Sequence, residues 1–396
     1  METHVLREPV RLLFRSALII FLVTIVIGIL NGMDVWDPTR QMILTHVHAG
    51  TLGWITLSVM GVALLMFGEN ADPVPATRLA QGLTAATALY VVAFATTTGL
   101  FRPIAGTLML VAIAWALWWV VGQWKSTPHT VPALGLLLAM ISLLVGAILG
   151  VILGIFIARG SVPGLSTETA SNVGGAHPPA MLTGYLLLAG VAIAEWRMVD
   201  RPALARESKL GSAIAWGLFG AGVLFNLAFI IPNENLVQPA SLLQVVGIVA
   251  FAVRMRSHLT PSAWKGAGTK IYAKLATVFL VVGVALLVYV VQLFVSGQLD
   301  PETGEGPIGV LIAFDHAMFI GVMTNVLFAG LALSMTYDTA QRVIVWGVNV
   351  GLVGFLLGLI TETTILKQIF TPIMGLALIH AVVVFFRRQG APASVA

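Results

Sequence analysis

The sequence contains no cysteine and few charged residues. Of its 396 residues, 21 are Lys or Arg and 17 are Asp or Glu, so charged side chains make up 10% of the chain. A soluble domain usually carries about a quarter of its residues as charged side chains. This deficit excludes a soluble enzyme, a nucleic-acid-binding protein and a disordered protein. The absence of cysteine excludes disulfides, thiolate-bound metals, iron–sulfur clusters and covalently attached c-type haem.

Apolar residues make up 58% of the chain and are gathered in long runs. A helix crosses a bilayer core of about 30 Å with roughly 20 apolar residues. Runs of this kind predict twelve membrane spans, near 13–30, 44–67, 79–99, 103–123, 132–157, 177–196, 211–231, 238–256, 272–296, 309–334, 342–360 and 369–386. No small-residue cleavage site follows the first run, so we expect an uncleaved helix there and not a signal peptide.

The basic residues predict the orientation of these spans. With a cytoplasmic N-terminus, the inner segments hold 17 of the 21 basic residues, and the outer segments hold only Arg40, Arg102, Arg159 and Lys367. Basic residues are concentrated on the cytoplasmic side of membrane proteins. We therefore expect an all-α polytopic protein with twelve spans and both termini in the cytoplasm, in a bacterial or archaeal cytoplasmic membrane with lipid as its main partner.

Five of the eight histidines fall inside apolar spans, where an ionisable side chain is costly and is a candidate for function. His46, His48, His177 and His316 lie near the starts of the second, sixth and tenth spans. These three spans run in the same direction, so the four histidines are expected in one layer near the outer face. His380 lies toward the inner end of the last span, and we expect it to be hydrogen-bonded to a neighbouring helix.

A spacing of four spans between these histidines suggests an internal repeat. The second and tenth spans both contain His-Ala-x-x-x-Gly, beginning at His48 and His316. Aligning Gly184 of the sixth span with the glycine of the second span places His177 opposite His46. We therefore interpret residues 1–396 as a single membrane domain of three pseudo-repeats, approximately 1–130, 131–262 and 263–396. The glycines are expected to admit either a neighbouring helix or a flat ligand.

Helical geometry indicates a use for the histidines. Residues i and i+2 of a helix project about 200° apart, so His46 and His48 cannot bind one ion together and instead face two sites. Histidines from different helices at one depth, with glycines that admit a flat ring, are typical of a bis-histidine haem. The simpler interpretation is that each histidine only makes a hydrogen bond within the bundle.

Twelve spans, cytoplasmic termini and outer histidines on the second and tenth spans resemble the catalytic subunit of haem-copper oxidases and nitric oxide reductases. The resemblance implies that His48 and His316 hold a b-type haem, with His46 as the alternative ligand from the second span. The His177-Pro178 pair is similar to the start of the family's copper motif, which leaves copper at His177 open, with Asn226 nearby. A second haem between His46 and His177 is also an open alternative.

This sequence departs from that family in its metal ligands. The seventh span has no histidine, and Phe314 stands where the tenth span of the family has the first of two histidines. Both departures argue against oxygen reduction at a haem–copper centre. The chain also resembles the NnrS family, haem- and copper-containing proteins of twelve spans linked to nitric oxide tolerance, in its His-x-His and in residues 316–324.

The sequence thus predicts a haem-binding membrane protein acting in electron transfer or nitric oxide handling, with no electron donor or partner subunit identified. Asp315 is expected either to orient the imidazole of His316 or to cap the tenth span. Arg102, Arg159 and Lys367 are outer bases that either anchor their helices at the membrane interface or pair with haem propionates. The alternative is a secondary transporter without a cofactor, for which these residues would count: Pro178, Pro179, Asn226, Asn325, Asn349 and Glu362.

Overall fold

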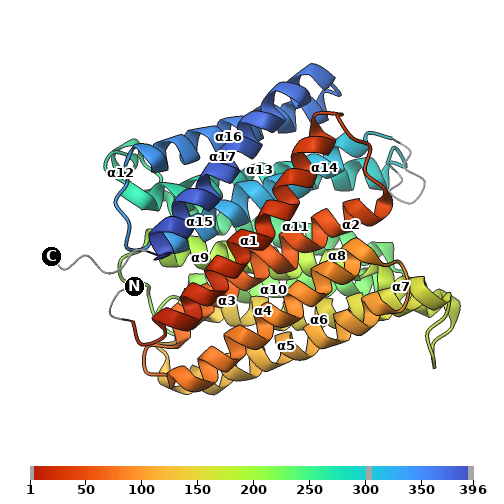
Figure 1. Ribbon diagram of the computed structural model, residues 1–396, viewed down its shortest axis with the longest axis horizontal. Coiled ribbons are helices and arrows are strands. Elements are labelled where there is room, and N and C mark those ends of the chain that lie inside the picture. The colour runs from red at the N-terminus through yellow and green to blue at the C-terminus, as the bar shows by residue number, and fades with distance from the viewer. Residues whose placement is uncertain (1–3, 300–305, 391–396) are drawn as a thin grey trace.

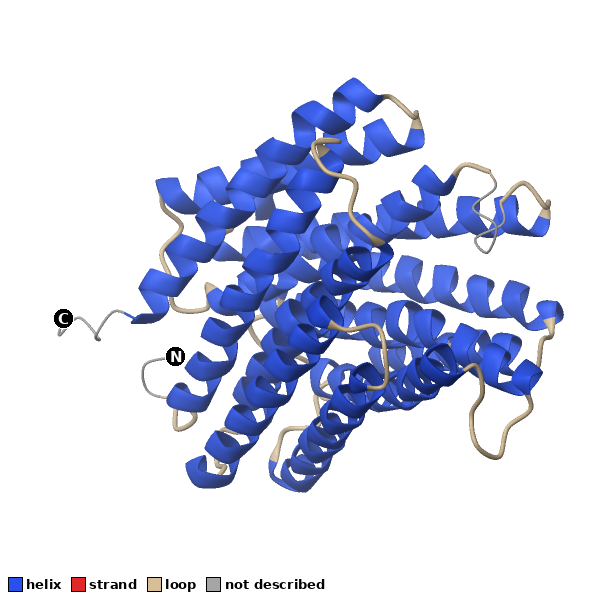
Figure 2. Ribbon diagram, turned by 45° about the vertical axis from the view of Figure 1, so that its right-hand side comes forward, coloured by secondary structure: helices blue, strands red, loops and turns tan. Residues whose placement is uncertain are grey.

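The computed structural model describes residues 4–299 and 306–390, which fold into helices joined by loops (Figure 2). Twelve of these helices are long and apolar enough to cross a membrane, so the described chain is an all-helical, multi-pass membrane protein. Both described ends lie at the same end of the bundle (Figure 1). The predicted all-α class and the predicted number of spans are therefore confirmed.

The first half of the chain forms six spans. Their helices are α1 (Arg7–Gly32), α2 (Arg40–His48) continuing into α3 (Leu57–Phe67), α4 (Pro73–Thr96), α5 (Phe101–Gln123), α6 (Val131–Arg159), and α7 (Thr167–Gly175) continuing through α8 (His177–Pro179) into α9 (Leu187–Met198). The sixth span begins at Thr167, before its apolar run, and the Pro178-Pro179 pair lies in the first turn of α8, where a helix of this span begins.

The second half of the chain forms the other six. Its helices are α10 (Lys209–Ile230), α11 (Val237–Arg254), the short α12 (Pro261–Trp264), α13 (Ile271–Val295), α14 (Ile308–His316) continuing into α15 (Asn325–Leu331), α16 (Thr339–Ile360) and α17 (Thr364–Gly390). The last helix begins before its apolar run and contains Pro372.

The three spans that carry the histidine layer form the inside of the bundle. In their most apolar windows, 89% of residues are buried for Arg40–Phe67, 83% for Thr167–Met198 and 67% for Ile308–Leu331. In the other nine spans the buried share is 33–56%, as expected for helices that face lipid on one side. The histidines therefore lie on helices shielded from the bilayer by the other nine.

Each of these inner spans changes from an α-helix to a π-helix immediately after its histidines. The π-helical segments are Ala49–Thr56, Ala180–Leu186 and Ala317–Thr324. They begin at the same place in the histidine alignment, one residue after His48 and His316 and three after His177. Long π-helical segments are rare and are found mostly at functional sites.

Below the histidine layer, two hydrogen bonds join the inner spans. The indole of Trp54 donates to the Thr324 hydroxyl at 3.0 Å, and the Tyr185 hydroxyl donates to Thr56 at 3.2 Å. Both threonine hydroxyls in turn donate to the carbonyl five residues earlier in their own π-helices. Because all these groups are buried, the bonds fix the inner helices against one another.

The glycines of the inner spans serve helix packing. A Cβ atom at Gly53 would lie 2.2 Å from Ile20 of α1, and one at Gly321 would lie 2.5 Å from Phe279 of α13. A Cβ at Gly184 would meet Ser142 of α6 at 3.2 Å. Of the two uses expected for these glycines, close approach of a neighbouring helix is the one observed.

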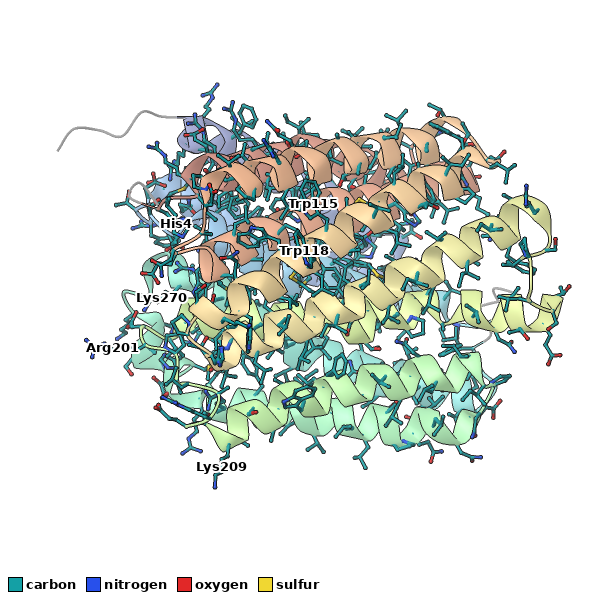
Figure 3. All side chains as sticks on the ribbon, turned by 90° about the horizontal axis from the view of Figure 1, so that it is seen from below. His4, Trp115, Trp118, Arg201, Lys209 and Lys270 are labelled. Carbon is teal, nitrogen blue, oxygen red and sulfur yellow. The ribbon has the colours of Figure 1, made fainter. Side chains whose placement is uncertain are left out.

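Charged loops cover the end of the bundle that holds both described chain ends. Arg201, Lys209 and Lys270 lie at this end together with His4 (Figure 3). The Lys270 ammonium pairs with Asp200 and holds the pKa of that carboxyl below its usual range. Three of the basic residues assigned to the inner side from the sequence, Arg201, Lys209 and Lys270, therefore share one end of the fold.

We predict that Gly222→Ala destabilises the protein by about 1–3 kcal/mol, since the added methyl would lie 2.8 Å from the backbone Cα of Gly184. Gly122→Ala is the matched control, because a Cβ there has no neighbour within 4 Å. Thermal unfolding in detergent, followed by circular dichroism, measures both. Equal melting temperatures would contradict the close packing of α10 on the sixth span.

Candidate functional site

Two cavities open beside the histidine layer. The larger, here called the large cavity, has a volume of about 500 Å³ and lies among α2, α4, α5, α6 and α8. His48 and His177 both line it. Its other walls are mostly apolar, and its volume falls within the roughly 300–1,000 Å³ of ligand pockets.

The second, here called the small cavity, has a volume of about 130 Å³ and is bounded by α1, the second and tenth spans, α16 and α17. His46 and His316 both line it. Their ring centres lie 6.4 Å apart, with the ring planes inclined by 26°. Two imidazoles on opposite sides of one metal ion, with bonds of about 2.0 Å, have ring centres about 6.3 Å apart.

The structure pairs the histidines differently from the pairing that the family resemblance implied. His48 lines the large cavity, whereas His316 lines the small one. Likewise, His177 lines the large cavity, whereas His46 lines the small one. His46, the alternative ligand from the second span, is the one that lies beside His316. The spacing argument holds, because His46 and His48 project to opposite sides of one helix and serve the two cavities.

All four imidazoles are anchored through Nδ1 to a backbone carbonyl. His46 and His177 bond to carbonyls of the preceding helix, whereas His48 and His316 bond to the carbonyl four residues earlier in their own helix. The partners and distances are Thr24 at 2.9 Å for His46, Gly146 at 2.8 Å for His177, Leu44 at 2.7 Å for His48 and Ile312 at 2.8 Å for His316.

This anchoring fixes the tautomer of each ring. A carbonyl oxygen only accepts, so Nδ1 carries the proton and the lone pair lies on Nε2. Within the described part of the chain, no hydrogen bond to the Nε2 atom of these four residues is found. A histidine that ligates a metal through one nitrogen usually donates a hydrogen bond from the other. The four rings are thus arranged as ligands.

Two glycines open the carbonyls that hold His46 and His177. Gly28 lies four residues after Thr24, and Gly150 lies four residues after Gly146. A Cβ at Gly28 would lie 3.0 Å from Cε1 of His46, and one at Gly150 would lie 2.8 Å from Cε1 of His177. In a helix, the side chain four residues ahead covers a carbonyl, and glycine leaves it free for a second donor.

Aromatic and basic side chains of α4 and α5 complete the large cavity. The ring of His48 stacks on Phe94 at 4.0 Å and meets the edge of Tyr90 at 5.5 Å. The guanidinium of Arg102 lies 4.8 Å from the centre of the Phe94 ring and donates from Nη2 to the Phe94 carbonyl at 2.9 Å. Its Nε is buried, with no hydrogen-bond partner in residues 4–299 and 306–390.

Asp315 lines both cavities. Its Oδ1 is buried and has no hydrogen-bond partner within the described chain. Nδ1 of His316 is bonded to Ile312, so Asp315 does not orient that imidazole as one interpretation of the sequence had it. A buried carboxyl oxygen without a partner is costly, so Asp315 contributes to the cavities at the expense of stability.

His380 and Asn226 lie outside both cavities. The buried Nε2 of His380 has no partner among the described residues, in contrast to the expected hydrogen bond. Asn226 does not line the large cavity, and the described part of the chain contains no group of three His, Asp or Glu side chains able to hold a metal ion. In the described part of the chain, His177 therefore does not belong to a group of three side chains able to hold the copper that the resemblance suggested.

Several of the residues weighed for transport or for binding propionates lie outside both cavities: Asn325, Asn349, Glu362, Lys367 and Arg159. Asn325 donates to Asn349 at 2.8 Å, and Glu362 lies in the turn between α16 and α17. Lys367 pairs with Asp34 at 2.6 Å. Arg159 is exposed and lines neither cavity. Of the three outer bases proposed to pair with propionates, only Arg102 lines a cavity.

Sequence reasoning missed Gly28, Gly150 and Phe94. No local pattern identifies them, because each lies in an apolar helix that also contains other glycines or aromatic residues. Comparison with known proteins gives no family assignment: no protein-family model matches the chain, and no curated protein is similar to it.

We predict that Asp315→Asn stabilises the protein by about 1–3 kcal/mol, because it removes a buried carboxylate whose Oδ1 lacks a partner among the described residues. Asp37→Asn, at an exposed loop position, is the control and should change little. Thermal melting in detergent distinguishes the two. A loss of stability in Asp315→Asn alone would mean that the carboxylate is satisfied by a bound ion or water.

Proposed function

We propose that this protein is an integral membrane electron-transfer protein that holds b-type haem between histidine pairs, as a distant relative of haem-copper oxidases and nitric oxide reductases without their haem–copper centre. The observation that carries the proposal is the common state of four buried imidazoles. Each has Nδ1 anchored to a carbonyl and Nε2 without a hydrogen bond to any described residue, and they line two cavities in pairs.

The threefold internal repeat that the sequence suggests would explain why there are two pairs. His46 and His177 share one role, because each bonds to the preceding helix beside a glycine, and His48 and His316 share the other. Each cavity combines one histidine that bonds to the preceding span with one that bonds within its own helix. The bonds from Trp54 to Thr324 and from Tyr185 to Thr56 connect the same two pairs of inner spans.

The third combination of inner spans is the sixth with the tenth. It lacks the pair of histidines and the glycine that the other two combinations have. In the histidine alignment, Phe314 stands at the first position and Pro179 at the second. The α13 residue that corresponds to Gly28 and Gly150 is Leu287, judged from the contacts of the inner-span glycines with α1, α6 and α13. Two metal sites and not three are therefore expected.

The residues present fit haem in different ways at the two cavities. The large cavity has the volume, two histidines and the Arg102 guanidinium, whose Nε has no hydrogen-bond partner among the described residues. The small cavity has the ring spacing of two axial ligands, but its volume of about 130 Å³ is less than a porphyrin needs. Flexible lining side chains such as Ile29 and Met374 would have to move outward there.

The chain's own residues would bind the haem and surround it with apolar side chains. Haem supplies reversible one-electron chemistry, and the histidines supply its axial ligands. The carbonyl bonds hold each imidazole at one angle and increase the basicity of Nε2. The surrounding helices line both cavities mostly with apolar side chains. Where both histidines ligate, the axial positions are filled, which favours electron transfer. Nitric oxide handling requires a position that one histidine leaves open.

The histidine layer is proposed to lie toward the outer face of the membrane. α2 and α14, which end in His48 and His316, lie at the opposite end of the bundle from both described chain ends (Figure 1). The basic loops gather at the end that holds those chain ends (Figure 3). The positive-inside rule would make that end cytoplasmic.

Reduced-minus-oxidised visible spectra of the detergent-purified protein, expressed with ample haem, test the proposal. We expect a b-type spectrum from two haems. His46→Ala and His316→Ala should remove one component, and His48→Ala and His177→Ala the other, because each pair lines one cavity. His129→Ala, whose exposed ring stacks on Trp124, is the control.

The outcomes separate the hypotheses. Loss of one haem in both His48→Ala and His316→Ala, with His46→Ala unaffected, would favour the pairing implied by the family resemblance. A colourless protein would reject haem binding and leave a transporter as the leading alternative. Addition of nitric oxide to the reduced protein shows whether either component has an open axial position.

A further prediction separates the cavities without touching a ligand. Gly150→Ala places a methyl group against the ring of His177 and should weaken the haem of the large cavity, whereas Gly28→Ala should weaken the other. Haem content per chain, measured after washing with competing apomyoglobin, reports the loss. Gly122→Ala should retain both haems, and equal retention in all three variants would contradict the role of these glycines.

A further inference from the structure

The small cavity brings two imidazoles together in a space too small for haem. His46 and His316 line it with their ring centres 6.4 Å apart, and its volume is about 130 Å³. Two imidazoles on opposite sides of one metal ion have nearly this separation. Pockets for drug-sized ligands have volumes of roughly 300–1,000 Å³. The two rings are therefore spaced for a metal ion, whereas the space between the walls does not admit the ring of a porphyrin.

Close contacts between α1 and α17 hold the walls of the small cavity in place. A Cβ atom at Gly375 would lie 2.3 Å from the side chain of Ile29, and one at Gly32 would lie 2.7 Å from that of Thr371. Ile29, Thr371 and Gly375 all line the cavity. Because glycine lets these side chains pack directly on the neighbouring helix, haem enters this cavity only if α1 and α17 move apart.

The donor atoms of the small cavity suit a metal ion with few ligands. His46 and His316 each offer the lone pair of Nε2, because each Nδ1 is bonded to a carbonyl. No group of three His, Asp or Glu side chains able to hold a metal ion occurs in the described chain, whereas zinc sites take three or four protein ligands. Monovalent copper is stable between two nitrogen ligands in line. Met374 also lines the cavity, and its thioether is of the kind that selects monovalent copper.

The charge of the small cavity also favours a monovalent ion. Among the described residues that line it, Asp315 is the only Asp, Glu, Lys or Arg. Its Oδ1 is buried and has no hydrogen-bond partner in residues 4–299 and 306–390. A buried charge is stabilised by an opposite charge nearby. One carboxylate beside two neutral imidazoles neutralises a monovalent ion, but it leaves a divalent ion with an uncompensated charge.

We infer that the small cavity, with its walls in place, binds one monovalent copper ion between Nε2 of His46 and Nε2 of His316, with the carboxylate of Asp315 as the counter-charge. The inference does not rest on the proposed function, and it leaves the large cavity as the proposed haem site. Copper and the second haem of the proposed function are alternative occupants of the same two imidazoles, so measurement of both distinguishes them.

Copper and haem content per chain, measured on the same purified protein, test the inference. The protein is expressed with ample haem and copper and is kept under argon with ascorbate. We expect one copper ion per chain, which His46→Ala and His316→Ala should each lose. His129→Ala removes an exposed histidine outside both cavities and should retain the ion. Copper that is retained in His46→Ala or in His316→Ala overturns the inference.

Competition with a chromophoric chelator of monovalent copper tests the counter-charge. Asp315→Asn should lower the affinity for copper about tenfold, as expected when one nearby opposite charge is lost. The same substitution is expected to stabilise the copper-free chain, so its effects on the two states have opposite signs. Asp37→Asn, at an exposed position, should leave the affinity unchanged. An unchanged affinity in Asp315→Asn rejects the counter-charge and with it the inference.

X-ray absorption at the copper edge tests the geometry without any substitution, so it does not depend on how the variants fold. We expect monovalent copper with two imidazole nitrogens at about 2.0 Å. A copper ion with four nitrogen ligands overturns the inference, because the small cavity has only two histidines among its described lining residues.

The combined outcomes separate the inference from the proposed function. Copper that is lost in His46→Ala together with a haem that is lost in His177→Ala supports both. Two haems and no copper overturn the inference and support the proposed function at both cavities. Copper without haem supports the inference and rejects the proposed function. A protein that binds neither rejects both.

Discussion

The hydrogen bond from Nδ1 of each buried histidine to a backbone carbonyl is the interaction on which both cavities depend. A polar group inside a bilayer must find its partner within the protein. Here one bond satisfies the proton-bearing nitrogen, fixes the ring and leaves the other nitrogen directed at a cavity. For His46 and His177 the acceptor is a carbonyl already used within its own helix, and Gly28 and Gly150 make it accessible.

This requirement explains the position of the histidines within the bundle. The three inner spans are the only described spans with at least two thirds of their apolar windows buried. Their π-helical segments follow directly on the histidines and turn Trp54 and Tyr185 toward threonines of neighbouring inner spans. The histidine layer and the hydrogen bonds below it therefore form one unit, which the outer nine spans shield from lipid.

The two cavities are built from corresponding positions but are not equivalent. The small cavity brings two rings to the separation of axial ligands, while the large cavity brings volume, aromatic walls and Arg102. The same arrangement of inner helices thus produces a narrow site and a wide one. In the histidine alignment, Phe314 and Pro179 occupy the two histidine positions between the sixth and tenth spans. These spans therefore contribute no third pair of histidines.

The sequence by itself determined that most of this protein lies in lipid, how many spans it has and where the histidine layer lies. These features can be read from composition and spacing alone, because placing charge in lipid is costly. It also determined that His46 and His48 serve different sites, since that follows from the geometry of one helix. Which histidine faces which partner was decided only by the tertiary structure. That choice depends on how the inner helices are rotated about their axes, and the rotation is set by contacts between distant segments, such as Gly53 with Ile20 and Gly321 with Phe279.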